Sequence, residues 1–169
     1  MTTMSLEALS ALEEIRQLKA RYAFLLDTKA WDQWRLLFTD DVECNVNDVV
    51  IQGADQFVEW VVGRIGEAAT VHHMHMPILE LTSSTTAVGI WPMFDYLQFP
   101  ESSPRPPFQG YGHYHEKYRS EPAGWKISYL QLTRLRIDDL RAVKPLVTST
   151  FDRPDVTSAA AKSLGPTGK

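Results

Sequence analysis

The chain has 169 residues, enough for one domain with a single core, and its 44% hydrophobic and 22% charged residues exclude a disordered or fibrous protein. A formal net charge of −4, without any run of Lys or Arg, gives no basis for binding nucleic acid or an anionic membrane. The single Cys44, the lack of a signal-peptide pattern and the lack of a long apolar run predict a soluble, cytoplasmic protein. Small molecules and other proteins are the expected partners.

The pattern of the first 67 residues predicts three helices. Apolar residues recur at three- and four-residue steps over residues 6–26, which indicates an amphipathic helix. Residues 30–38, AWDQWRLLF, suggest a short second helix, and residues 39–46, TDDVECNV, a turn followed by a strand. Residues 53–67, GADQFVEWVVGRIGE, carry an acidic first turn and helical apolar spacing, so a third helix should end near Gly66.

The pattern then changes to long strands. Four segments are expected as strands: 70–81, 86–99, 108–119 and 125–137. Helices followed by a four-strand meander predict an α+β fold, in which the helices pack on a curved antiparallel sheet. We expect one domain over residues 1–140 and a C-terminal extension over 141–169, whose last ~15 residues should be mobile.

Three histidines lie within four positions of the segment 69–81, ATVHHMHMPILEL. If this strand turns back symmetrically about residues 83 and 84, residues whose numbers sum to 167 lie opposite each other. Three pairs then share one face of the sheet: His72 with Asp95, Met74 with Met93, and Met76 with Trp91. Opposite residues have Cβ atoms roughly 4.5–5.5 Å apart, close enough for an imidazole–carboxylate contact. A turn one residue longer would change the sum to 168 and move Asp95 to the other face.

The other two histidines of this segment point to the opposite face and allow a second interpretation. His73 and His75, followed by Glu80, have the spacing of the first metal motif of a cupin, and His113 and His115 form another pair on one face. The sequence lacks both the glycine expected seven residues after the Glu and the second cupin motif. In a regular strand, Glu80 would also point to the face opposite His73 and His75. A cupin-like metalloenzyme is therefore the lower-ranked alternative, and we expect no metal.

Three segments together resemble one known family. They are IRQLKARYAFLLDTKAWDQWRLLFTDDVE (15–43), TVHHMHMP (70–77) and GYGHYHEKYRSEPAGWKIS (110–128). In their order and spacing they resemble the SnoaL-like branch of the NTF2-like, cystatin-like α+β cone fold, over about residues 10–138. Scytalone dehydratase, bile-acid dehydratases and lindane dehydrochlorinase belong to this group, and they eliminate or isomerise without a cofactor by means of a His–Asp pair.

The resemblance implies a set of site residues. The family's T-x-H histidine falls on His72, its helix-end aspartate on Asp27, and the tyrosine five residues earlier on Tyr22, while Asp95 falls where dehydratases place a second acid or histidine. The polar residues that scytalone dehydratase places late in its sheet have no clear match, nor does the basic residue of the dehydrochlorinase. Substrate and exact reaction therefore do not transfer.

A His–Asp pair in an apolar cone predicts general acid–base chemistry. His72 would abstract a proton next to a carbonyl, Asp27 would orient the ring, Tyr22 would donate to the enolate oxygen, and Asp95 would be a protonated acid that assists a departing hydroxyl. The expected substrate contacts are Met74, Trp91, Met93 and Tyr114. We thus predict a cofactor-independent lyase or isomerase, dehydratase-like, for an activated, largely apolar cyclic, polyketide-like or steroid-like molecule.

Two alternatives remain open. The same fold can serve as a non-catalytic small-molecule-binding module. Tyr22 can be a core residue and Asp27 a turn residue without any catalytic role. Apolar residues expected on the outer sheet face, Ile90, Phe94 and Leu132, also predict a homo-oligomer, either a dimer or a trimer.

Overall fold

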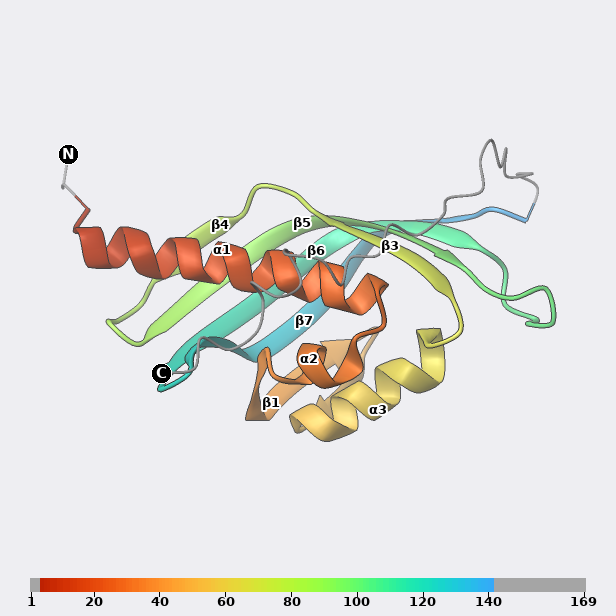
Figure 1. The fold of residues 1–169 in the computed structure, drawn as a ribbon. Coiled ribbons are helices and arrows are strands. Elements are labelled where there is room, and N and C mark those ends of the chain that lie inside the picture. Colours follow the sequence, from red (N-terminus) through yellow and green to blue (C-terminus); the bar gives the residue numbers. More distant parts are fainter. Residues whose placement is uncertain (1–3, 142–169) are drawn as a thin grey trace, which may run out of the picture.

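The computed structural model describes residues 4–141, and in it a long helix lies across the concave face of a curved sheet (Figure 1). The helices are α1 (Leu6–Asp27), α2 (Trp31–Arg35) and α3 (Ala54–Ile65). The strands are β1 (Phe38–Val46), β2 (Val49–Gln52), β3 (Ala69–Met74), β4 (Ile78–Leu81), β5 (Thr86–Gln98), β6 (Phe108–Glu121) and β7 (Gly124–Asp139). Apart from its first residue, the expected C-terminal extension lies outside the described residues.

Helix α1 covers the sheet with a continuous apolar stripe. The side chain of Ser5 caps its first turn by accepting a hydrogen bond from the Ala8 backbone N–H at 3.2 Å. The stripe buries Leu12, Ile15, Leu18, Lys19, Tyr22, Leu25 and Leu26. The helix ends at Asp27, and Lys29 then adopts a positive φ of 61°, which turns the chain toward α2. The predicted helix is confirmed, with one buried lysine among its apolar residues.

The seven strands form one mixed sheet. Their order is β2-β1-β7-β6-β5-β3, and β4 also pairs with β5. All neighbours are antiparallel except β1 and β7, which run parallel and are separated in the chain by β2, α3 and the four strands β3 to β6. The α+β class and the curved sheet under the helices are confirmed, but the sheet is not wholly antiparallel.

The segment expected as one strand over residues 70–81 is two strands with different registers. In β3, His72 pairs with Asp95 and Met74 with Met93, so paired numbers sum to 167 as predicted. In β4, Leu81 pairs with Ala87, a sum of 168. Residues 75–77 belong to neither strand and absorb the difference. The predicted pairing of Met76 with Trp91 is therefore wrong, and Met76 is 90% exposed.

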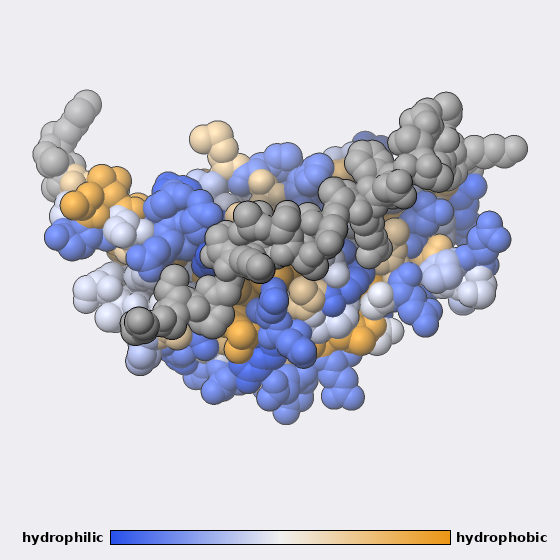
Figure 2. All heavy atoms as spheres, viewed as in Figure 1, coloured by the Kyte–Doolittle hydropathy of each residue, from blue (hydrophilic) through white to orange (hydrophobic). Residues whose placement is uncertain are grey.

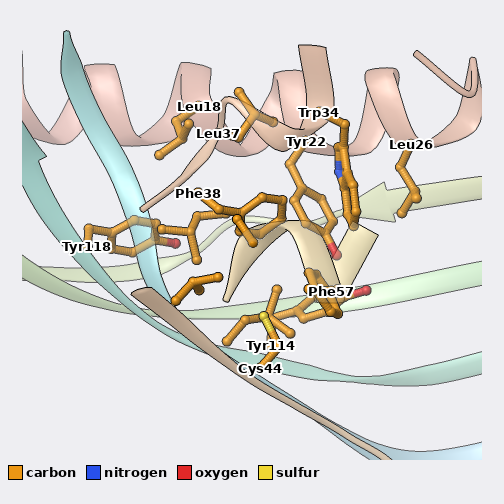
Figure 3. Close-up of a cluster of buried hydrophobic side chains, with 14 of the residues drawn as sticks. Leu18, Tyr22, Leu26, Trp34, Leu37, Phe38, Cys44, Phe57, Tyr114 and Tyr118 are labelled. Atoms are coloured by element: carbon orange, nitrogen blue, oxygen red, sulfur yellow. The ribbon is translucent and has the colours of Figure 1, made fainter. Parts of the chain in front are cut away.

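An aromatic cluster fills the space between α1, α2, α3 and β1 (Figure 3). Trp34 of α2 packs on Phe38 and Phe57 with ring centroids 4.9 and 5.4 Å away, and on Tyr22 of α1 at 5.3 Å. Edge-on and tilted contacts of this kind stabilise a fold beyond the area they bury. Outside this core, the view in Figure 2 shows a largely hydrophilic surface with hydrophobic residues in scattered groups.

Candidate active site

A cavity of about 120 Å³ lies between α1, α3 and the concave face of the sheet, with room for several water molecules and so for a small organic molecule. Its polar and ionisable lining residues are Tyr22, Asn47, Arg64, His72, Asp95, Arg105, Tyr114 and Arg134. Its apolar lining residues are Leu26, Trp34, Val46, Phe57, Trp60, Val61, Ile65, Leu97, Phe108 and Leu132. Convergent polar groups in a mostly apolar cavity are typical of a substrate site.

Asp27 and His72 form a close pair at this cavity. Nδ1 of His72 lies 2.6 Å from Oδ1 of Asp27, and the His72 backbone N–H donates to Oδ2 at 2.8 Å. The His72 side chain is 5% exposed and that of Asp27 24%, so little water competes for the contact. Because the carboxylate binds both the ring and the backbone of one residue, it fixes the orientation of the imidazole.

Two further residues hold the carboxylate of Asp27. The Thr70 hydroxyl donates to Oδ1 of Asp27 at 2.9 Å and accepts a hydrogen bond from Nζ of Lys29 at 2.8 Å. Burial lowers the pKa of Lys29, and the negative charge of Asp27 opposes that change. The end of α1 and the start of β3 are thereby tied together by side chains, which places Asp27 beside the sheet.

Asp95 lies directly opposite His72 on β5, as the predicted register requires, but its partner is Arg134 of β7. The guanidinium donates to both carboxylate oxygens at 2.7 and 2.6 Å, and the Asp95 side chain is 2% exposed. Burial alone would lower the pKa of Arg134, yet the hydrogen bonds and charge of Asp95 raise it. Both oxygens of Asp95 thus accept hydrogen bonds from Arg134, whereas the expected acid would have to donate from one of them to a departing hydroxyl.

Gly110 of β6 leaves the space that this ion pair occupies. It lies opposite Asp95 in the sheet, and a Cβ on it would overlap both the Arg134 guanidinium and Oδ1 of Asp95. A residue without a side chain is required here for a steric reason, because the backbone needs no positive φ at this position.

Two phenols, Tyr22 and Tyr114, line the cavity and are 2% and 4% exposed. Their ring centroids are 5.8 Å apart. Burial is the largest cause that raises the pKa of each phenol above its usual value, and for Tyr114 the charge of Asp95 adds to it. Both groups therefore remain protonated at neutral pH and can donate hydrogen bonds. Tyr22 belongs both to the aromatic core and to the cavity lining.

Of the four predicted substrate contacts, only Tyr114 lines the cavity. Trp91 is buried away from it, where Nε1 donates to the Tyr118 hydroxyl at 2.6 Å. Met93 is 3% exposed and packs in the core, with its sulfur 3.8 Å from Nη1 of Arg134, and Met74 is half-buried at the end of β3. These three methionine and tryptophan positions support the core, and α3 supplies much of the apolar wall instead.

His73 lies on the other side of β3 from His72, and His75 follows the end of that strand. Both are exposed, the His73 ring packs 5.9 Å from the ring of Phe94, and the His75 backbone N–H donates to the Pro92 carbonyl at 2.9 Å. Within residues 4–141, no three His, Cys, Asp or Glu side chains converge in a way that would hold a metal ion. The cupin-like convergence of His73, His75 and Glu80 is therefore not found.

The outer face of the sheet carries fewer apolar residues than expected. Ile90 and Phe94 lie there, half-buried, but Leu132 is 8% exposed and lines the cavity on the inner face.

Among the helices in the described part of the chain, none combines the length and the apolar character needed to cross a membrane.

The sequence analysis did not identify three charged lining residues, Arg64, Arg105 and Arg134. Arg134 lies two residues beyond Leu132 on the inner face of β7, although alternation counted from Trp125 predicts the outer face for both residues. On the inner face, the buried carboxylate of Asp95 provides the partner that an arginine among apolar residues requires.

Comparison with known proteins places the fold in context. Residues 7–131 match the family model described as a SnoaL-like domain. A hexachlorocyclohexane dehydrochlorinase (LinA-type3) from Novosphingobium barchaimii is similar in structure with a TM-score of 0.74 at 17% identity, covering 83% of this chain and 97% of that one. A candidate scytalone dehydratase from Novosphingobium aromaticivorans is similar with a TM-score of 0.72 at 20% identity, covering 87% of this chain and 100% of that one. An NTF2-like protein with a cystatin-like fold, also from N. aromaticivorans, has a TM-score of 0.65 at 20% identity, covering 94% of this chain and 91% of that one.

Proposed function

The chain belongs to the SnoaL-like domain family, and on that premise we propose that it is a cofactor-independent lyase of the dehydratase type that uses His72 and Asp27 in acid–base catalysis. One observation carries the proposal: the 2.6 Å contact between Nδ1 of His72 and Oδ1 of Asp27 at the wall of a cavity that also holds two protonated phenols. A base, an orienting carboxylate and hydrogen-bond donors are the groups that proton abstraction next to a carbonyl requires.

His72 is the base. In its neutral form the ring donates Nδ1–H to Asp27, which leaves the lone pair of Nε2 to accept a proton from the substrate. Asp27 then stabilises the imidazolium without taking its proton. The backbone N–H of His72 and the hydroxyl of Thr70 keep the carboxylate in place while this charge appears.

The phenols stabilise the oxyanion. When a proton leaves the carbon next to a carbonyl, negative charge develops on the carbonyl oxygen, and fixed donors in a low-dielectric cavity stabilise it more than water does. Tyr22 and Tyr114 suit this task because burial raises the pKa of both phenols, so neither ionises in place of the substrate.

The elimination step balances with these groups. The α-hydrogen goes to Nε2 of His72, the electron pair of the C–H bond forms the new double bond, and the β-hydroxyl leaves. The proton now held by His72 returns to the departing hydroxide, so that one molecule of water is lost and His72 is regenerated. Asp95 holds Arg134 at the cavity wall and takes no proton in this scheme.

The proposed substrate is a cyclic, largely apolar molecule whose α-proton is already activated. General acid and base assistance contribute about 10²–10⁴-fold each, which suffices for a proton next to a carbonyl but not for an unactivated C–H bond. The mostly apolar lining of the cavity agrees with such a ring.

The test measures water loss from cyclic β-hydroxyketones, from 3-hydroxycyclohexanone to 3-hydroxy-1-tetralone, by the ultraviolet absorbance of the conjugated product. We expect turnover by the wild type and a loss of about 10²–10⁴-fold in His72→Ala. His73→Ala is the matched control, because the neighbouring imidazole is exposed on the other face, and its turnover should stay unchanged. Undiminished turnover in His72→Ala contradicts the proposal, and binding of the ketones without turnover favours a non-catalytic binding module.

A further inference from the structure

Two arginines stand at the exposed edge of the cavity. Arg64 comes from the last turn of α3, and Arg105 from the loop between β5 and β6. Both line the cavity and both are exposed, whereas the lining residues His72, Asp95 and Tyr114 are buried. The two guanidinium groups therefore lie where a molecule would enter from solvent.

Both side chains are held in place by neutral groups. The guanidinium carbon of Arg64 lies 3.7 Å from the ring centroid of Trp60, and that of Arg105 lies 3.9 Å from the centroid of Phe99. Nη1 of Arg105 also donates to the backbone carbonyl of Arg64. Stacking on a ring leaves the edge of a guanidinium, with its N–H donors, free to bind a ligand.

Neither arginine has a carboxylate partner among residues 4–141, although Arg35, Arg119 and Arg134 each pair with one or more. The two arginines are neighbours at the cavity, with Nη1 of Arg105 on the backbone carbonyl of Arg64, and burial and then the positive charge of Arg64 lower the pKa of Arg105. Two like charges held together in a chain of net charge −4 are stabilised when an anion binds between them.

We propose that Arg64 and Arg105 form an anion subsite, which binds a carboxylate or phosphate group carried by the substrate while the apolar ring of the substrate lies deeper in the cavity. Guanidinium groups bind both oxyanions through paired N–H donors. This inference rests on the proposed function, because it names the class of substrate that the same cavity takes: an apolar ring compound with an anionic group at its outer end.

The test compares the binding of three matched probes by isothermal titration calorimetry: 2-naphthoate, its neutral methyl ester, and 2-naphthyl phosphate. The wild type should bind at least one anionic probe about tenfold or more tightly than the ester, and rising NaCl should reduce the difference. Whether the carboxylate or the phosphate binds more tightly distinguishes the two oxyanions. In the double variant Arg64→Gln/Arg105→Gln the preference for the anion should disappear, while affinity for the ester stays within about twofold.

The control is Arg16→Gln, which removes an exposed arginine of α1 that does not line the cavity. It should keep the preference of the wild type. Equal affinity of the wild type for ester and anions, or a preference that survives in the double variant, overturns the subsite and leaves the proposed dehydratase function standing. Failure of all three probes to bind counts against the cavity as a substrate site and thus against both proposals.

Discussion

The concave face of the sheet holds two clusters of ionisable residues that differ in their access to small molecules. The first is the cavity site with His72 and Asp27. The second, which we call the closed network, consists of Lys19, Trp91, Glu116 and Tyr118. Nζ of Lys19 lies 2.5 Å from Oε1 of Glu116, and both side chains are 0% exposed. The Tyr118 hydroxyl donates to Oε2 of Glu116 and accepts from Nε1 of Trp91.

The difference between the clusters shows that a buried ionisable group with a shifted pKa is not by that alone a catalytic group. Burial lowers the pKa of Lys19, and the negative charge of Glu116 opposes it, as at many catalytic lysines. No described cavity reaches both members of the pair, however, whereas His72 lines a cavity with phenols and arginines. We therefore assign the closed network to the architecture of the core and the cavity site to chemistry.

Two tyrosines connect the clusters. Nζ of Lys19 lies 3.8 Å from the ring centroids of both Tyr22 and Tyr114, and these two residues also line the cavity. A cation between two ring faces holds both rings by electrostatic attraction. The closed network thereby fixes the position of the phenols that the proposed mechanism uses.

The largest expected effect is on stability, from the substitution Lys19→Met. It leaves Glu116 buried without its counter-charge, and breaking a buried ion pair in this way costs about 3–5 kcal/mol of unfolding free energy. Urea denaturation measures it. The double substitution Lys19→Met/Glu116→Gln should recover most of the loss, and a single variant as stable as the wild type would contradict the structural role of the pair.

Asp27→Asn should reverse this outcome, with a large effect on turnover and a small one on stability. The amide cannot stabilise the imidazolium of His72 and favours the wrong tautomer, so turnover of the β-hydroxyketones should fall roughly 10²–10³-fold, equivalent to about 3–4 kcal/mol. Kinetics and urea denaturation are measured on the same preparation. A variant that unfolds as readily as Lys19→Met but retains turnover would refute the division between the clusters.

Gly110→Ala should disturb the Asp95–Arg134 pair at the cavity wall. The new methyl group overlaps both side chains, and overpacking of this kind costs about 1–3 kcal/mol. Turnover should fall with it, because Arg134 moves at the cavity wall. The matched control is Gly63→Ala in α3, where a Cβ meets no atom within 4 Å and the helix should gain about 0.5–1 kcal/mol.

The smallest effect concerns alkaline pH. Burial raises the pKa of Tyr22 and Tyr114 in the folded protein, so above about pH 10 the unfolded chain releases these protons first and stability falls as pH rises. Each tyrosine contributes a slope of at most about 1.4 kcal/mol per pH unit. Urea midpoints between pH 8 and pH 11 should show a shallower decline in Tyr22→Phe and in Tyr114→Phe than in the wild type. An identical decline in all three proteins contradicts the burial of the phenols.

The helices and the facing of His72 and Asp95 were accessible from the sequence, because apolar periodicity and strand alternation depend on local spacing. The place of Asp27 beside His72 was expected only from the family resemblance. The cavity wall that β7 forms with Leu132 and Arg134 was not accessible from the sequence, because β7 contains an irregularity in its pairing. Ser128 has no partner in the pairing of β6 with β7, so the parity of inner residues changes from Trp125 and Ile127 to Leu130 and Leu132. Simple alternation from Trp125 places Leu132 and Arg134 on the outer face, where they are not found.

The predicted facing of His72 and Asp95 was correct although one assumption behind it was not. The turn that joins β4 to β5 has the longer register, which by itself would have moved Asp95 to the outer face. The irregular residues 75–77 compensate by one position before β3 begins to pair. A non-pairing segment that contains a proline was the available signal, since proline interrupts the hydrogen bonding of a strand.

The same break at residues 75–77 separates the register of β3 from that of β4, so a change at one end of this hairpin need not reach the other. A one-residue insertion or deletion in the exposed turn at residues 82–85 changes the pairing of the four residues of β4, and the non-pairing segment can lengthen or shorten to absorb it. His72 then keeps its partner on β5 and its contact with Asp27. A change in the length of this turn is therefore expected to leave the proposed catalytic centre unchanged.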